Sequence, residues 1–166
     1  MKKTLACIPV LMLVFGLLSG CGSRAQEEER YAIKAQSLGE LMTRQASACV
    51  SQSKAYMAVW EYARVSEVDF KTAAKDMLGA ETRENKAMMV EHKSMIENLL
   101  EELSDPSSDF ESTYDRLSEL YDIYVKLHDL AMDPSDDMQK HMETVDTLMD
   151  QVLEKKRELD ATFVVR

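Results

Sequence analysis

Residues that break helices are scarce in this chain, and this scarcity constrains its fold more than any other feature. The 166-residue sequence has five Gly and three Pro, and beyond residue 22 the only glycines are Gly39 and Gly79. Between these positions apolar residues recur at the spacing of an amphipathic helix. The sequence therefore predicts an all-α fold. The same scarcity excludes Gly-rich phosphate loops and the GxSxG nucleophile elbow.

The segment from about Ala25 to Gly79 predicts an unusually long helical stretch. Its apolar stripe comprises Leu38, Met42, Cys49, Tyr56, Ala63, Phe70, Ala74 and Met77. Helices of globular proteins usually run for about 8 to 20 residues, so this stretch is either one long helix or two helices joined by a kink. The sequence "VSEVD" offers a restart, with Ser66 as the cap of a second helix.

A short motif occurs twice in the second half of the chain. "DPSSDF" at residues 105–110 returns as "DPSDDM" at residues 133–138. In each copy Asp is expected to cap a helix and Pro to take its first position, where the missing N–H costs nothing. Short connections favour antiparallel neighbours. Together with the long first segment, these helices predict an elongated antiparallel helical bundle of three to four helices, the first long or kinked.

The first twenty residues have the order of an export signal. Lys2 and Lys3 precede an apolar core at residues 5–18, which is followed by the small residues Ser19 and Gly20. This core is shorter than the roughly 20 residues that a membrane-spanning helix needs. We therefore expect residues 1–20 to be a signal peptide that is cleaved.

The junction Leu18-Ser19-Gly20-Cys21 resembles the lipobox of bacterial lipoproteins, an aliphatic residue and two small residues before a cysteine. The resemblance covers residues 1–22. It implies cleavage before Cys21, acylation of this residue and attachment to the membrane through its lipid. It also implies a place in the cell envelope, and on the periplasmic face of the outer membrane if the host is Gram-negative, because Gly22 is not Asp. The alternative is an ordinary secretory signal that leaves Cys21 as a free thiol.

The rest of the chain is expected to form a lipidated N-terminus and tether at residues 21–29 and a bundle domain at residues 30–166. The formal net charge of the whole chain is −10 at pH 7. So acidic a surface disfavours nucleic acid and favours a basic partner or dissolved cations. Cys49 would be the single thiol of the mature protein that carries no lipid, and its place on the apolar stripe predicts that it is buried.

Histidine and methionine lie close together in the sequence. Met132 follows His128 by one helical turn, and Met138 precedes His141 by one turn. Thioether and imidazole ligands suit copper(I). If the helices on either side of Pro134 pair about that residue, His128 and His141 lie within a turn of each other and share a site with Met132 or Met138. The competing interpretation makes these residues part of the core, with no cofactor bound.

No HExxH, CxxCH or EF-hand motif occurs in the sequence. We therefore expect no catalysis. The expected function is that of a membrane-anchored envelope lipoprotein that presents a helical bundle for protein–protein interaction, self-association or structural support. The alternative is a lipoprotein that binds copper or another small ligand through the histidines and methionines of its helices.

Overall fold

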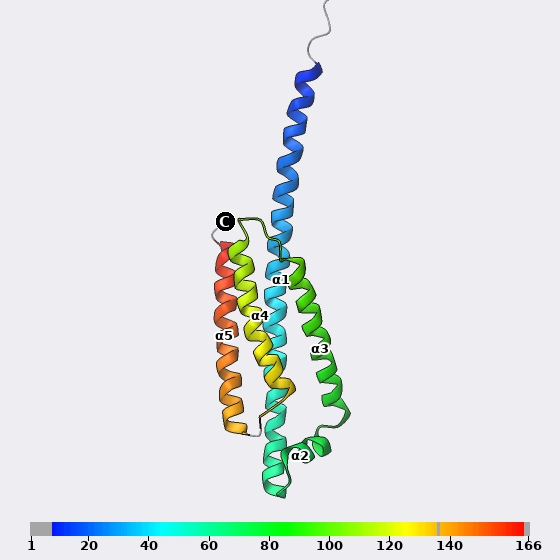
Figure 1. The fold of residues 1–166 in the computed structure, drawn as a ribbon, viewed down its shortest axis with the longest axis vertical. Coiled ribbons are helices and arrows are strands. Elements are labelled where there is room, and N and C mark those ends of the chain that lie inside the picture. Colours follow the sequence, from blue (N-terminus) through cyan, green and yellow to red (C-terminus); the bar gives the residue numbers. More distant parts are fainter. Residues whose placement is uncertain (1–7, 136, 165–166) are drawn as a thin grey trace, which may run out of the picture. The chain divides into compact units, whose positions relative to one another are not determined.

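The computed structural model describes residues 8–135 and 137–164, with side chains from residue 24 onward except at 80, 81 and 164. Five helices follow one another: α1 (Ile8–Ser66), α2 (Phe70–Met77), α3 (Gly79–Glu102), α4 (Glu111–Met132) and α5 (Met138–Val164) (Figure 1). No strand occurs in these ranges, which confirms the all-α prediction. Among the helices searched, none combines the length and apolar character needed to span a membrane.

The chain forms two units, residues 1–34 and residues 35–166. The hydrophobic residues found buried in the described part all belong to the second unit. The predicted signal peptide, residues 1–20, and the side chain of Cys21 lie outside the residues whose side chains are described. Cleavage and lipidation therefore stay predictions.

The long N-terminal stretch ends at Ser66. Glu67 has a φ of 56°, the left-handed conformation that often follows a helix. The N–H of Val68 then donates to the carbonyl of Ala63 at 3.1 Å, which satisfies one of the last carbonyls of α1. The backbone thus turns sharply after Ser66, without a glycine at the turn.

The restart falls in "VSEVD", but its cap is Asp69 and not Ser66. Asp69 has an extended backbone, and its carboxylate accepts hydrogen bonds from the N–H of Thr72 at 3.0 Å and from the Thr72 hydroxyl at 2.6 Å. These bonds lower the pKa of Asp69. Ser66 is instead the last residue of α1. Asp69 takes the role of cap because it directly precedes α2 and its carboxylate reaches the first free N–H groups of that helix.

The first Asp-Pro motif lies in a connection and does not start a helix, contrary to the sequence prediction. The N–H of Phe110 donates to the carbonyl of Ser107 at 2.8 Å, so residues 107–110 form a turn. Phe110 is buried at the N-cap of α4, with no capping side chain. Burial of this ring within the turn delays the start of the helix until Glu111.

The second Asp-Pro motif also does not start a helix where the sequence predicts it. Helix α4 ends at Met132, and Asp133 follows as its C-cap, with its N–H donating to the carbonyl of Asp129 at 3.0 Å. Asp137 accepts a hydrogen bond from the N–H of Lys140 at 3.0 Å and so caps α5, which begins at Met138. A capping carboxylate four residues later than expected lengthens the connection between α4 and α5.

The longer connection changes how α4 pairs with α5. Three polar contacts join them: Thr113 to Thr162 at 3.2 Å, Arg116 to Glu158 at 3.1 Å and Lys155 to Glu119 at 3.0 Å. The residue numbers of each pair sum to 274 or 275, so the two helices run in opposite directions. A turn centred on Pro134 would give a sum of about 267.

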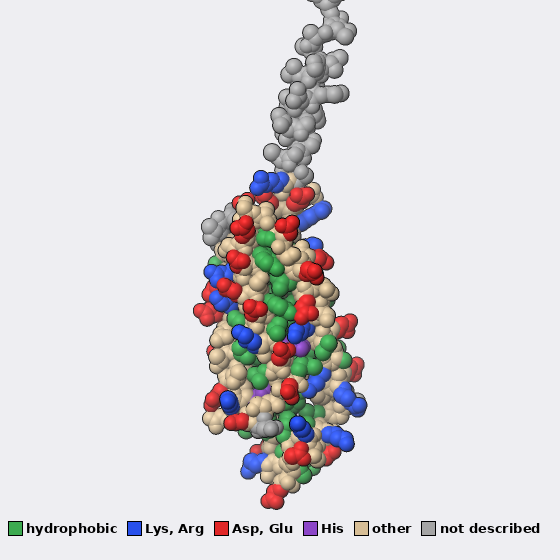
Figure 2. Space-filling view, viewed as in Figure 1, with side chains coloured by type: hydrophobic (Ala, Val, Ile, Leu, Met, Phe, Trp, Pro, Cys, Tyr) green, Lys and Arg blue, Asp and Glu red, His purple; other side chains and the backbone are tan. Residues whose placement is uncertain are grey.

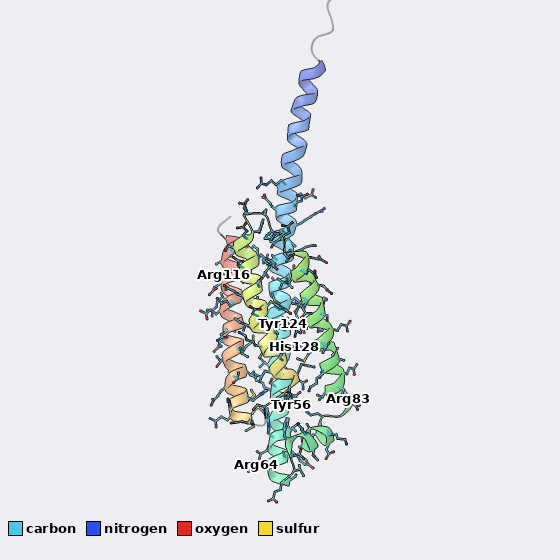
Figure 3. All side chains as sticks on the ribbon, viewed as in Figure 1. Tyr56, Arg64, Arg83, Arg116, Tyr124 and His128 are labelled. Carbon is cyan, nitrogen blue, oxygen red and sulfur yellow. The ribbon has the colours of Figure 1, made fainter. Side chains whose placement is uncertain are left out.

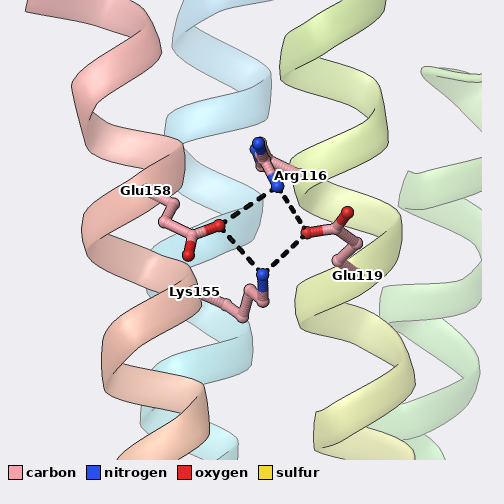
Figure 4. A network of polar contacts seen from close by, with 4 residues as sticks. All are labelled: Arg116, Glu119, Lys155 and Glu158. Carbon is pink, nitrogen blue, oxygen red and sulfur yellow. Dashed lines mark hydrogen bonds and ion pairs between the residues drawn. The ribbon is translucent and has the colours of Figure 1, made fainter.

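Two of these contacts belong to a ring of four alternating charges (Figure 4). Arg116 also contacts Glu119 at 2.8 Å, and Lys155 contacts Glu158 at 2.9 Å. Hydrogen bonds from Lys155 and Arg116 lower the pKa of Glu119. Because all four side chains are partly open to solvent, the contribution of the ring to stability is small, and its main effect is to favour one register.

The core follows the stripes that the sequence predicts. Its largest fully buried side chains include Leu38, Met42, Tyr56, Ile96, Leu117, Tyr124, Leu127, Val145 and Leu159. Cys49 is buried as expected, and burial raises the pKa of its thiol to about 12. Tyr121 is only half-buried, and its hydroxyl donates to the carboxylate of Glu97 on α3 at 2.6 Å.

Helix α1 approaches α5 closely at Gly39. A Cβ atom added at this position would lie 2.5 Å from Cδ2 of Leu159, which is fully buried. Glycine inside a helix costs about 1 kcal/mol relative to alanine. The absence of a side chain at Gly39 is therefore explained by the space that Leu159 occupies.

Replacing Gly39 with Leu is expected to lower the free energy of unfolding by about 1–3 kcal/mol, because the new side chain overpacks the contact with Leu159. Urea denaturation measures this change. Adding Leu159→Ala should make the double variant more stable than the sum of the single effects predicts. Glu40→Leu, at the adjacent exposed position, is the control. Additive effects of the Gly39 and Leu159 changes would contradict the close approach.

Candidate functional site

His128, one of the two predicted copper ligands, lies buried on α4 (Figure 3). Its Nδ1 is 3.0 Å from the carboxylate of Asp129, and its ring centroid is 6.1 Å from that of Tyr124. Because a carboxylate accepts, Nδ1 is the protonated nitrogen. The hydrogen bond lowers the pKa of Asp129. The other nitrogen, Nε2, is buried and has no hydrogen-bond partner among the described residues.

His141 has a different set of neighbours. Its ring packs against Trp60 of α1, with centroids 5.1 Å apart, and its Nδ1 accepts a hydrogen bond from the N–H of Ser135 at 3.3 Å. The proton of the neutral ring therefore lies on Nε2, which is buried without a hydrogen-bond partner in the described part. Burial lowers the pKa of His141 and keeps the imidazole neutral.

The observed register sets the two histidines apart along the helices. His128 lies opposite about residue 146 and not 139, so His141 is roughly 7 Å away along the axis at 1.5 Å per residue. Met138 is exposed, and Met132 lines a separate hollow. No group of three His, Cys, Asp or Glu side chains suited to a metal occurs in the residues searched. Copper binding by these four residues stays a prediction.

A hollow of about 570 Å³ lies between α2, the start of α3 and the end of α4. Its size is within the usual range for small-ligand sites, roughly 300–1,000 Å³. Much of its lining is apolar: Tyr56, Phe70, Ala74, Leu78, Met132 and Pro134. Figure 3 shows Tyr56 and Arg83 at nearby levels of α1 and α3.

Four cationic side chains line the same hollow. Lys71 and Lys75 come from one face of α2, and Arg83 and Lys86 come from one face of α3. Asp133 is the single carboxylate in the described lining. Figure 2 shows Lys and Arg side chains gathered over this part of the surface, at the lower right. We call this hollow with its four cations the basic hollow.

Lys86 is held in place by two contacts. Its ammonium donates to the carbonyl of Met132 at 2.7 Å and lies 5.6 Å from the centroid of the Tyr56 ring. The Tyr56 hydroxyl in turn donates to the carbonyl of Ala131 at 3.2 Å. The end of α4 therefore fixes both the cation and the ring beneath it.

A second hollow of about 360 Å³ lies between α1 and α3. Gln52 lines it and is buried, and its Nε2 has no hydrogen-bond partner within the described part of the chain. Met88, Met89 and His92 lie on the opposite wall. This places another histidine beside thioethers, although the sequence prediction centred on His128 and His141.

The sequence contains one signal for the basic hollow that our prediction did not use. Lys71 and Lys75 are four residues apart, and Arg83 and Lys86 are three apart, so each pair shares a helical face. Nothing in the spacing alone shows that the two faces meet. Their convergence depends on the sharp connection at Leu78 and Gly79, where α2 ends and α3 begins.

Comparisons with known proteins give no relative for the chain. No protein-family model matches it, and no curated protein or solved structure is significantly similar to it.

The lowered pKa of His141 predicts a loss of stability in mild acid. The unfolded chain binds a proton as pH falls through about 6.5, while folded His141 resists protonation. The free energy of unfolding should therefore fall between about pH 7.5 and about pH 5.5. His141→Gln, which cannot ionise, should show a smaller fall in the same denaturation series. An equal fall in both proteins would contradict the assignment of a neutral, buried His141.

Proposed function

We propose that the protein is a lipid-anchored, non-enzymatic lipoprotein of the cell envelope that presents a helical bundle to a protein partner or to another copy of itself. The observation that carries this proposal is Leu18-Ser19-Gly20-Cys21 directly behind a basic and apolar stretch. Two or three acyl chains on Cys21 would give a lasting attachment, whereas one chain holds a protein only marginally. In a Gram-negative host the anchor would lie in the outer membrane, facing the periplasm.

The mature part is, in this proposal, an antiparallel bundle of α1, α3, α4 and α5. Contacts of α3 with α4 support it, because the residue numbers rise along one helix as they fall along the other. These contacts are Lys86 to Met132, Lys93 to Asp129 and Glu97 to Tyr121. The contacts of α1 with α5 follow the same rule, since Gly39 lies near Leu159 and Trp60 near His141.

Exposed apolar side chains support the interaction part of the proposal. Met88 and Met95 lie seven residues apart on α3, and more than two fifths of each side chain is exposed. Tyr62 and Val65 are similarly exposed near the end of α1. Exposed apolar groups that share a helical face are a common feature of surfaces that contact another protein.

Cys21→Ala is expected to abolish incorporation of a clickable fatty acid into the protein and to release it from the membrane fraction. The reason is that the thiol of Cys21 would carry the first acyl chain. Gel fluorescence after labelling in a bacterial host measures incorporation. The matched control is Cys49→Ala, which should label like the wild type. Undiminished labelling of Cys21→Ala would refute the anchor.

A further inference from the structure

The basic hollow is lined mainly by cations, although the protein as a whole is acidic. The chain has 30 acidic and 20 basic residues, yet the described lining has four cations and one carboxylate. Lys71, Lys75 and Arg83 are exposed, and no ion pair or hydrogen bond joins their side chains to other described residues. Like charges brought together on folding repel one another. A bound anion would relieve this repulsion.

Favourable positions at helix ends explain two of the four cations. Lys86 donates to the carbonyl of Met132, in the last turn of α4, where a cation is favourable. Lys75 lies in the last turn of α2, where the helix dipole also favours a cation. Lys71 and Arg83 have no comparable role within the fold. Their placement around the same hollow therefore favours the binding of an anion from outside the chain.

The apolar part of the lining constrains the ligand further. The rings of Tyr56 and Phe70, with centroids 6.0 Å apart, form one part of it, and Ala74, Leu78 and Met132 form another. Tyr56 is buried, but a bare inorganic anion would leave the half-buried Phe70, Ala74, Leu78 and Met132 against water. An anionic group joined to an apolar or aromatic body would satisfy both the cations and the apolar surface.

We propose that the basic hollow binds a small amphipathic anion, a phosphate or carboxylate on an apolar or aromatic body. Arg83 and the lysines would hold the anionic oxygens, with Lys86 already oriented by Met132 and Tyr56. The apolar body would lie over Phe70, Leu78 and Met132, which are half-buried. A small ligand fits better than a nucleic acid, because the acidic surface elsewhere repels large polyanions. This binding is independent of lipidation at Cys21.

Isothermal titration calorimetry with 2-naphthyl phosphate tests the proposal. The full-length lipoprotein is held in phosphatidylcholine nanodiscs, and empty nanodiscs give the background. The wild type should bind the probe saturably, and added salt should weaken the binding. Inorganic phosphate, which lacks the apolar body, and 2-naphthol, which lacks the charge, should each bind at least tenfold more weakly.

Charge removal inside and outside the hollow provides the matched variants. Lys75→Gln with Arg83→Gln should raise the Kd at least tenfold, because two charge-assisted contacts are lost; both side chains are exposed, so the fold should persist. Arg44→Gln with Lys126→Gln removes the same charge from exposed positions away from the hollow. This second pair should leave the Kd within twofold of the wild type.

An anion of this kind can belong to a membrane lipid or to a free molecule. Nanodiscs that contain phosphatidylglycerol distinguish these two sources. Weaker probe binding in these discs would identify a lipid headgroup as the occupant, and unchanged binding would identify a free molecule. Three results would overturn the proposal: no saturable binding by the wild type, equal Kd values for the wild type and the Lys75/Arg83 variant, or an equal loss in the Arg44/Lys126 control.

Discussion

The aromatic contact between Tyr56, Trp60 and Phe70 connects more of this structure than any other. Trp60 stacks on Phe70 with centroids 5.0 Å apart, and Tyr56 meets both rings edge to face at 6.0 Å. His141 also packs against Trp60, with centroids 5.1 Å apart, and the Tyr56 hydroxyl reaches the end of α4. One cluster thus joins α1, α2, α4 and α5. Aromatic pairs contribute about 0.5–1.5 kcal/mol beyond the burial of their area.

The basic hollow depends on this cluster. Tyr56 and Phe70 belong to both, so whatever fixes the rings also fixes part of the hollow. Val59, Ala63 and Ala73 pack behind them and hold α2 against α1. The four cations lie on helices whose positions follow from that packing. An acidic chain can therefore present one concave, positively charged region at a defined place.

The periodic features of the fold were predictable from the sequence, and the local ends of the helices were not. Apolar stripes placed Leu38, Met42 and Cys49 in the core, where the structure has them. The Asp-Pro motifs suggested caps at the wrong residues, because burial of Phe110 and capping by Asp137 outweigh the preference of proline for a first turn. That shift moved the register of α4 against α5 and separated His128 from His141. The basic hollow escaped prediction because two pairs of cations converge only once the α2–α3 connection is known.

Photoaffinity labelling with 4-azidophenyl phosphate tests the central claim, that this part of the fold recognises an amphipathic anion, most directly. The full-length protein in phosphatidylcholine nanodiscs would be irradiated with the probe, digested and sequenced by mass spectrometry. The account predicts labels within residues 70–86 and 132–134, and protection of these residues by excess 2-naphthyl phosphate. Labels confined to other segments, or labelling of these residues that the competitor leaves unchanged, would contradict it.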